Sequence, residues 1–294
     1  MSGIATAAWP EVRAWRKAAR AQLIAARIAL PAPVRAAWTA GLVERLRPLL
    51  LRAPAPVSFY WPFKAEPDFR PLMRELDAAG IAVALPVAFK LGEALTFRPW
   101  HRGCAMERGI WDIPIPATAE AVRPRTLIAP IVGFDAGNFR LGYGGGFFDR
   151  TLEQLGGEAQ AIGVGFSMFR LPTIAPQPHD IAMARIVTER DESQPAATAG
   201  KVCYADEMRP DYAGYLPAGE IAAILAPLAG ILPPERRGLL DFILWRLEIP
   251  PSSHGGAPDL DAARALAPRI RDDAIHAALG ALLADFPAPG LDRR

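Results

Sequence analysis

Short apolar runs alternate with amphipathic segments over the first 190 residues of the chain. Short runs rich in β-branched residues are typical of buried strands, and apolar side chains at every third or fourth position are typical of helices. The expected strands cover residues 57–61, 81–86, 95–98, 126–132, 160–166 and 185–188, and the expected helices cover residues 10–29, 33–52, 68–79 and 147–155. Residues 99–125 show no clear period and are expected to be irregular. The alternation predicts an α/β fold, with a mostly parallel sheet covered by helices on both faces.

The pattern changes after residue 190. Residues 191–216 are polar and rich in small side chains, so they are expected to form a linker. Residues 217–294 contain three segments with helical spacing, at 220–228, 235–247 and 259–283. We therefore divide the chain into an α/β domain at 1–190, a linker at 191–216 and a small helical appendage at 217–294, whose role the sequence does not indicate.

The composition excludes several classes of protein. The 33 basic and 31 acidic residues give a formal charge of +2, which argues against nucleic acid or an anionic membrane as the main partner. Two cysteines and four histidines show neither a disulfide framework nor the spacing of a zinc site. Basic residues interrupt the N-terminal segment, so it does not read as a signal peptide. We expect a cytoplasmic protein that is a monomer or a weak homodimer.

The glycine-rich string at residues 140–150 is the most informative motif. It lies between an expected strand and an expected helix, where glycines allow a phosphate to approach backbone N–H groups and the helix N-terminus adds its dipole. Arg140 supplies a fixed positive charge. Asp149 lies in the first helical turn, and a carboxylate beside a phosphate requires a bridging cation, for which Mg²⁺ is suited. The expected phosphate-binding residues of the string are Arg140, Gly142, Gly144, Gly145 and Gly146.

The string matches neither of the two common nucleotide-binding patterns. It lacks the Gly-Lys-Ser/Thr ending of the Walker loop and the spacing of the dinucleotide fingerprint. A plain tight turn is the alternative interpretation of a glycine cluster, and the flanking Arg140 and Asp149 favour the anion site.

Three further groups of residues have two interpretations each. Arg16, Lys17 and Arg20 share one arc of the first helix, either as a solvated basic face or as a phosphate clamp. The segment 60–68 could receive a flat heteroaromatic ligand that pairs with Glu66, or its aromatic residues could cap the core. Trp111 is a candidate for the same ligand wall, although core packing is its commoner role.

The dipeptide His179-Asp180 is the last group of residues that could take part in catalysis. It could act as a catalytic pair, but no serine or cysteine nucleophile stands in a recognisable elbow. We therefore favour a structural turn at this dipeptide.

Taken together, these residues resemble the 5-formyltetrahydrofolate cyclo-ligase family, also called 5,10-methenyltetrahydrofolate synthetase. The resemblance rests on the string 140–150, the segment 60–66, the basic first helix, Leu85-Pro86, and the stretch from His179-Asp180 to residues 187–189. These pieces occur in the family's order and cover about residues 10–190.

The resemblance implies a three-layer α/β/α domain that uses ATP and Mg²⁺ to convert 5-formyltetrahydrofolate into 5,10-methenyltetrahydrofolate. The folate and ATP would be its small-molecule partners. By motif position, ATP would be held by Arg16, Lys17, Arg20, Arg140, Gly142, Gly144, Gly145 and Gly146, and Mg²⁺ by Asp149. Tyr60, Glu66 and Trp111 would bind the folate, and Arg140 and Tyr143 are the candidate catalytic residues.

The chain departs from the family at two positions that are usually acidic, where it has Ala184 and Ile115. These departures favour an alternative hypothesis, in which the protein is a catalytically impaired regulatory relative that binds folate or nucleotide. The complete set of Arg140, the glycines and Asp149 favours the enzyme.

Overall fold

The structure is a computed structural model that describes residues 4–190, 218–247, 258–270, 272–284 and 286. Its contacts divide the chain into two compact units, Met1–Arg20 with Ala36–Glu192, and Ala21–Arg35 with Ser193–Arg294. We call them the α/β unit and the helical unit. Residues 21–35 therefore group with the C-terminal part of the chain. The division made from the sequence instead assigned them to the α/β domain at 1–190. The expected linker 191–216 lies outside the described residues.

A six-stranded sheet forms the centre of the α/β unit, in the order β10-β9-β6-β1-β2-β3. All neighbouring pairs are parallel except β2 and β3, which are antiparallel. The strands are β1 (Val57–Ser58), β2 (Val83–Val87), β3 (Thr96–Trp100), β6 (Thr126–Pro130), β9 (Gln160–Val164) and β10 (Arg185–Val187). The predicted α/β fold with a mostly parallel sheet is thus confirmed.

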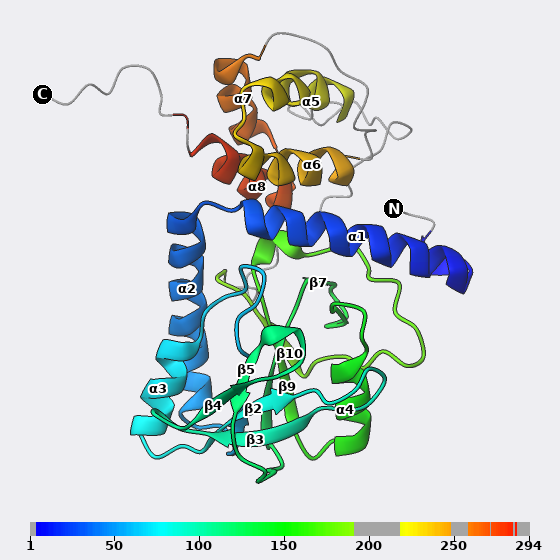
Figure 1. Ribbon diagram of the computed structural model, residues 1–294. Helices are drawn as coiled ribbons and strands as arrows, with labels where there is room; N and C mark the ends of the chain where they lie inside the picture. The colour runs from blue at the N-terminus through cyan, green and yellow to red at the C-terminus, as the bar shows by residue number, and fades with distance from the viewer. Residues whose placement is uncertain (1–3, 191–217, 248–257, 271, 285, 287–294) are drawn as a thin grey trace, which may run out of the picture. The chain divides into compact units, whose positions relative to one another are not determined.

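Helices cover both faces of this sheet (Figure 1). The helices α2 (Ala32–Leu50) and α3 (Arg70–Ala78) lie on one side, and α4 (Phe147–Leu155) lies on the other. The bounds of α4 agree with the expected helix, because an amphipathic segment is followed there by glycine. Gly156 ends the helix in the left-handed conformation, at φ 57°. The core between the layers includes Leu127, Ile128 and Ala129 of β6, which are fully buried.

The strand order places a topological switch point between β1 and β6. From β1 the chain proceeds to β2 and β3 on one side, and from β6 it proceeds to β9 and β10 on the other. In open α/β sheets, ligands bind beyond the carboxyl ends of the strands at such a point. The segment after β1 and the glycine string after β6 both begin at this edge of the sheet.

Two expectations for the α/β unit were wrong. Residues 99–125 are not irregular throughout, because β4 (Met106–Arg108) and β5 (Pro114–Pro116) pair as an antiparallel ribbon around the short 3₁₀ helix Ile110–Asp112. The expected strand 57–61 is paired only at Val57 and Ser58, and the residues after them form a loop. A second ribbon, β7 (Gly133–Phe134) with β8 (Arg140–Leu141), leads into the glycine string.

The helical unit has its own apolar core. Its described helices are α5 (Ala218–Leu225), α6 (Arg237–Arg246), α7 (Leu260–Leu266) and α8 (Asp273–Leu283), with short 3₁₀ segments at Ala226–Gly230, Pro234–Arg236 and Ala267–Arg269. The helix expected at 259–283 is divided, because Pro268 cannot continue an α-helix and the chain is 3₁₀ there. Asp272 accepts hydrogen bonds from the first N–H groups of α8 and pairs with Arg246 at 2.8 Å.

The long helix α1 (Trp9–Ala29) contributes to both units, since residues up to Arg20 belong to the α/β unit and the rest to the helical unit. Within the helical unit, Nη1 of Arg236 donates to the carbonyl of Ala29 at 2.8 Å and so satisfies one of the last carbonyls of α1. No helix among the described residues has the length and apolar character needed to cross a bilayer.

Candidate active site

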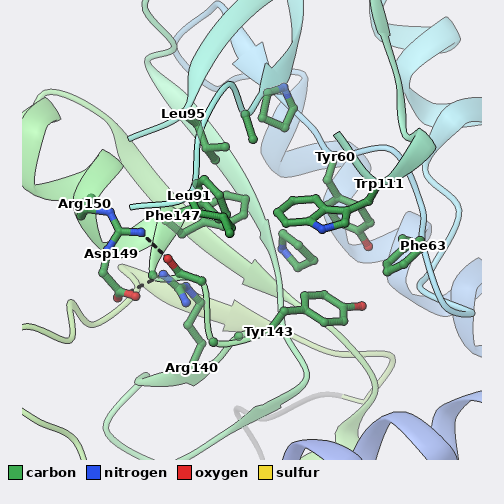
Figure 2. A pocket seen from close by; sticks show the side chains of 18 of the residues that line it. Tyr60, Phe63, Leu91, Leu95, Trp111, Arg140, Tyr143, Phe147, Asp149 and Arg150 are labelled. Carbon is green, nitrogen blue, oxygen red and sulfur yellow. Dashed lines mark hydrogen bonds and ion pairs between the residues drawn. The ribbon is translucent and has the colours of Figure 1, made fainter. Parts of the chain in front are cut away.

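A cavity of about 880 Å³ opens in the α/β unit at the switch point. Its walls come from α1, from the loops after β1 and β2, from the ribbon of β4 and β5, and from the glycine string. Figure 2 shows Arg140, Asp149 and Arg150 at one end and Tyr60, Phe63 and Trp111 at the other, with Tyr143 between them. The cavity thus has a charged compartment and an aromatic compartment, and its volume suits a cofactor-sized ligand.

The glycine string takes conformations that other residues rarely adopt. Gly144 has φ 94° and Gly146 has φ 64°, both left-handed, and Gly146 caps the N-terminus of α4. Among the described residues, the N–H groups of Gly144, Gly145 and Gly146 donate no hydrogen bond to the protein. The string therefore presents unsatisfied donors beside the positive end of a helix dipole, which are the elements of an anion site.

Arg140 is the buried charge of this compartment. Its side chain is 5% exposed, and its Nη2 lies 3.1 Å from Oδ1 of Asp149, which is close enough for an ion pair. Neither Nε nor Nη2 has a hydrogen bond with good geometry to any described residue. Burial lowers the pKa of the guanidinium, although Asp149 opposes this effect. Because Nε and Nη2 form one edge of the guanidinium, these two donors are a fork that matches a phosphate.

Asp149 stands at the same end of the cavity. Its Oδ1 also accepts a hydrogen bond from the N–H of Ile181 at 3.3 Å, and its side chain is 16% exposed. The described residues contain no group of three or more His, Cys, Asp or Glu side chains that could hold a metal ion. A single carboxylate next to a phosphate site still fits Mg²⁺, which usually takes one or two carboxylates and completes its shell with phosphate oxygens and water.

The three basic residues expected on α1 occupy different places. Arg16 is buried, and its guanidinium donates to the carbonyls of Ile174 and Ala175, both at 3.0 Å, and pairs with Asp180 at 2.5 Å. Arg20 is half-buried and donates to the carbonyl of Gly142 at 2.7 Å. Burial, followed by the nearby charge of Arg16, lowers the pKa of Arg20. The structure brings Arg16 and Arg20 to the cavity wall, whereas Lys17 is exposed and does not line it.

The dipeptide His179-Asp180 forms the turn that the sequence favours. Oδ2 of Asp180 accepts from the N–H of Gln177 at 2.6 Å, and the N–H of Asp180 donates to the carbonyl of Gln177 at 2.9 Å. Burial favours the neutral acid, but the hydrogen bonds from Arg16 and Gln177 outweigh it and lower the pKa of Asp180. His179 packs edge-on against Trp9, with ring centroids 5.7 Å apart.

The aromatic compartment contains the residues expected to bind the folate. Tyr60 is buried, and its hydroxyl donates to the carbonyl of Pro67 at 3.1 Å. Oε2 of Glu66 accepts from the N–H of Phe63 at 2.9 Å, and Oε1 accepts from the hydroxyl of Tyr143 at 2.7 Å. Trp111 does not pack in the core. It is 54% exposed, with φ 59°, so its indole forms part of the cavity mouth.

Among the cavity residues that were not expected from the sequence are Trp9, Arg13 and Arg150. Trp9 and Arg13 lie on the face of α1 that carries Arg16 and Arg20, and their spacing of four and three residues could have indicated this. Arg150 follows the string; its Nη2 donates to the carbonyl of Gly145, and its guanidinium lies 5.8 Å from the ring of Phe147. The position of Arg150 in the first turn of the helix after the string could have indicated that it lies near the anion site.

The two departures from the family pattern lie in different surroundings. Ile115 is buried and contributes to the cavity wall together with Ile113 and Pro114. Ala184 is exposed just before β10, and it does not line the cavity. The lack of a carboxylate at residue 184 therefore removes no group from the cavity wall. At residue 115, by contrast, an isoleucine in place of a carboxylate makes the wall apolar.

The fold and the cavity define an α/β protein with a phosphate-type anion site next to an aromatic compartment. Comparisons with known proteins identify the family to which this α/β protein belongs. The model of the 5-formyltetrahydrofolate cyclo-ligase family matches residues 12–189, and the chain belongs to this family. The resemblance noted from the sequence is thus confirmed.

Curated relatives and solved structures agree with this assignment. The 5-formyltetrahydrofolate cyclo-ligase of Mycolicibacterium smegmatis is 32% identical over 142 residues, which are 46% of this chain and 73% of that protein. The enzyme of the same name from Escherichia coli K12 is 31% identical over 140 residues, which are 45% of this chain and 76% of that protein. The match to the solved 5,10-methenyltetrahydrofolate synthetase of Mycoplasma pneumoniae has a TM-score of 0.50 and 22% identity, over 60% of this chain and 99% of that one. The corresponding structure from Aquifex aeolicus has a TM-score of 0.53 and 21% identity, over 68% and 99%. At these identities the two structures support the fold.

Proposed function

We propose that this protein converts 5-formyltetrahydrofolate into 5,10-methenyltetrahydrofolate, using ATP and releasing ADP and phosphate. Membership of the family and the names of its curated relatives support this activity. The observation that carries the proposal is the buried fork of Arg140, whose Nε and Nη2 have no hydrogen-bond partner among the described residues, beside the unsatisfied N–H groups of the string. Asp149 offsets the charge of Arg140, and a phosphate would supply acceptors for these two buried N–H donors.

The reaction explains why a phosphate site must adjoin a folate site. Closing the ring requires loss of the formyl oxygen, which is a poor leaving group from an amide. Transfer of the γ-phosphoryl group of ATP to this oxygen makes it a good one; the second folate nitrogen then attacks the formyl carbon, and phosphate leaves with the oxygen. Catalysis of phosphoryl transfer depends mainly on positioning and on cations that offset the phosphate charge.

Each part of the charged compartment has a role in this proposal. The Arg140 fork and the N–H groups of residues 144–146 bind phosphate oxygens, and Arg20 adds a half-buried positive charge at the same wall. Asp149 holds Mg²⁺, which offsets phosphate charge when it is bound. Arg16 acts through its contacts with Asp180 and the carbonyls of residues 174–175, and so keeps α1 on this wall. Lys17, which is exposed, would reach ATP only from outside the cavity wall.

The aromatic compartment would hold the pterin. Tyr60 and Trp111 offer ring surfaces, and the Glu66 carboxylate offers acceptors to the N–H edge of a heteroaromatic ring. Leu91, Leu95 and Ile113 supply an apolar wall. Ile115 replaces a carboxylate in the cavity wall, but Arg140, the glycines and Asp149 are all in place, and they support the enzyme over the impaired regulatory relative.

An absorbance assay for the methenyl product tests the proposal. Purified protein is mixed with 5-formyltetrahydrofolate and Mg²⁺, with and without ATP, and released phosphate is measured in parallel. Product and phosphate should appear in equal amounts and only with ATP. Product without ATP, or no product from a folded preparation, would refute the enzyme.

A further inference from the structure

One hydrogen bond joins the glycine string to the aromatic compartment. The hydroxyl of Tyr143, in the string, donates to Oε1 of Glu66 at 2.7 Å across a sequence separation of 77 residues. Glu66 is 7% exposed, so its carboxylate is largely buried. A hydrogen bond to a buried charged group is stronger and more directional than one at the surface.

The backbone before Glu66 also orients its carboxylate. Lys64 and Ala65 both have left-handed conformations, with φ 47° and φ 59°, which cost about 1 kcal/mol or more each in residues other than glycine. This tight turn lets the N–H of Phe63 donate to Oε2 at 2.9 Å. Strain of this kind persists where the surroundings hold it, and it is concentrated at functional sites. One carboxylate oxygen is thus fixed by its own turn, and the other by Tyr143.

The ring of Tyr143 is attached to the same turn. It lies 6.1 Å from the ring of Phe63, at 59°, and Nζ of Lys64 lies 5.9 Å from its centroid. Tyr143 is nevertheless 40% exposed at the cavity surface, so these contacts do not make it part of the core. The next residues along the chain, Gly144 to Gly146, carry the unsatisfied N–H groups of the anion site. Tyr143 therefore connects the anion-binding string to the Glu66 carboxylate through one hydrogen bond.

We propose that Tyr143 is a positioning residue that couples the two compartments. It orients the Glu66 carboxylate toward the N–H edge of the folate, and because it belongs to the anion-binding string, nucleotide and folate each raise the affinity of the other. This inference rests on the proposed function, since it takes ATP and a folate as the two ligands. Coupling between two sites is reciprocal, so it can be measured from either one.

Titration calorimetry with two probes measures the coupling directly. The affinity of the Mg²⁺ complex of a non-hydrolysable ATP analogue is determined alone and with saturating 5-formyltetrahydrofolate, which cannot react with the analogue. The wild-type ratio of the two affinities should be about tenfold, within the usual range of coupling between sites. Tyr143→Phe keeps the ring and loses the hydroxyl, and in this variant the ratio should fall to within about twofold of one. The loss of one hydrogen bond to a charged group is enough to remove a tenfold effect.

A matched control uses the other hydroxyl of the aromatic compartment. Tyr60→Phe removes the bond to the carbonyl of Pro67, which does not reach the string, so the coupling ratio should remain. In a Glu66→Ala background, Tyr143→Phe should have no further effect on the ratio, because the partner of the hydroxyl is gone. Thermal unfolding of each variant confirms that it is folded.

The outcomes separate this inference from the proposed function. A Tyr143→Phe protein that keeps the wild-type ratio, or a wild-type ratio at or below one, overturns the coupling role of Tyr143. Absence of ATP-dependent methenyl product from the wild type overturns the proposed function instead. Equal loss of coupling in Tyr60→Phe also counts against the inference, because the effect would not depend on the bond to the string.

Discussion

Replacement of Arg140 by lysine should weaken nucleotide binding by about tenfold to a hundredfold. The Nε and Nη2 atoms of Arg140 are buried without hydrogen-bond partners among the described residues, and together they can donate two parallel bonds to one phosphate. A lysine ammonium keeps the charge but cannot reproduce this fork. One lost charge-assisted hydrogen bond costs about 1.5–3 kcal/mol, and each 1.4 kcal/mol corresponds to about a factor of ten in affinity.

The assay is titration calorimetry with a non-hydrolysable ATP analogue and saturating Mg²⁺. Arg246→Lys is the matched control, because Arg246 is also a buried arginine with a carboxylate partner, at 2.8 Å, but belongs to the helical unit. The control should bind the analogue as the wild type does. If Arg140→Lys also binds it with wild-type affinity while remaining folded, the fork does not contact phosphate.

Three further predictions follow from the same compartment. Asp149→Asn should raise the Mg²⁺ concentration for half-maximal turnover by at least about tenfold, because it removes a charge interaction of a few kcal/mol. Gly146→Ala should lower the free energy of unfolding by about 1–2 kcal/mol and weaken nucleotide binding, because φ is 64° and a Cβ would lie 2.8 Å from Nη1 of Arg150. The lowered pKa of Asp180 implies a contribution to stability that is complete above the unfolded pKa of about 4 and is lost as the pH falls through the folded pKa. Urea unfolding at pH 6 and pH 3 should therefore show a larger loss in the wild type than in Asp180→Asn.

Each of these predictions has an outcome that contradicts it. Unchanged Mg²⁺ dependence in Asp149→Asn excludes a metal-binding role. Gly156→Ala is the control for Gly146→Ala, since Gly156 has φ 57° but a Cβ added there would meet nothing within 4 Å. Equal nucleotide binding in the two alanine variants would mean that the crowding at Gly146 is irrelevant to the string. Parallel pH profiles for the wild type and Asp180→Asn would show that the ion pair contributes nothing to stability.

Much of the α/β unit was predictable, because local signals and tertiary packing agree there. The helix Phe147–Leu155 begins after a glycine, has one apolar face and ends at Gly156, so its bounds follow from the sequence. The strand β6 is a short apolar run and is buried along nearly all of its length. The ribbon of β4 and β5 was missed because its strands have three residues each, too few to show a period, and β5 begins and ends with proline.

The site was less predictable than the fold for a related reason. A helical arc identifies which side chains share a face, but it does not say which of them turn inward. Arg16 is buried in an ion pair, whereas Lys17, the next residue, is exposed. The contact between Tyr143 and Glu66 joins segments that are distant in sequence. The orientation of the Glu66 carboxylate depends on a strained turn at residues 64–65, and no local sequence pattern predicts this turn.

In the proposed reaction, the apolar side of the cavity also affects the fate of the activated folate. Leu91, Leu95, Ile113 and Ile115 line this side, and they offer no side-chain group that could hold a water molecule against the reacting carbon. An activated formyl group is an electrophile that either the neighbouring folate nitrogen or a solvent molecule can attack. A hydrocarbon surface gives the intramolecular nitrogen the advantage, and so limits the loss of ATP to simple hydrolysis.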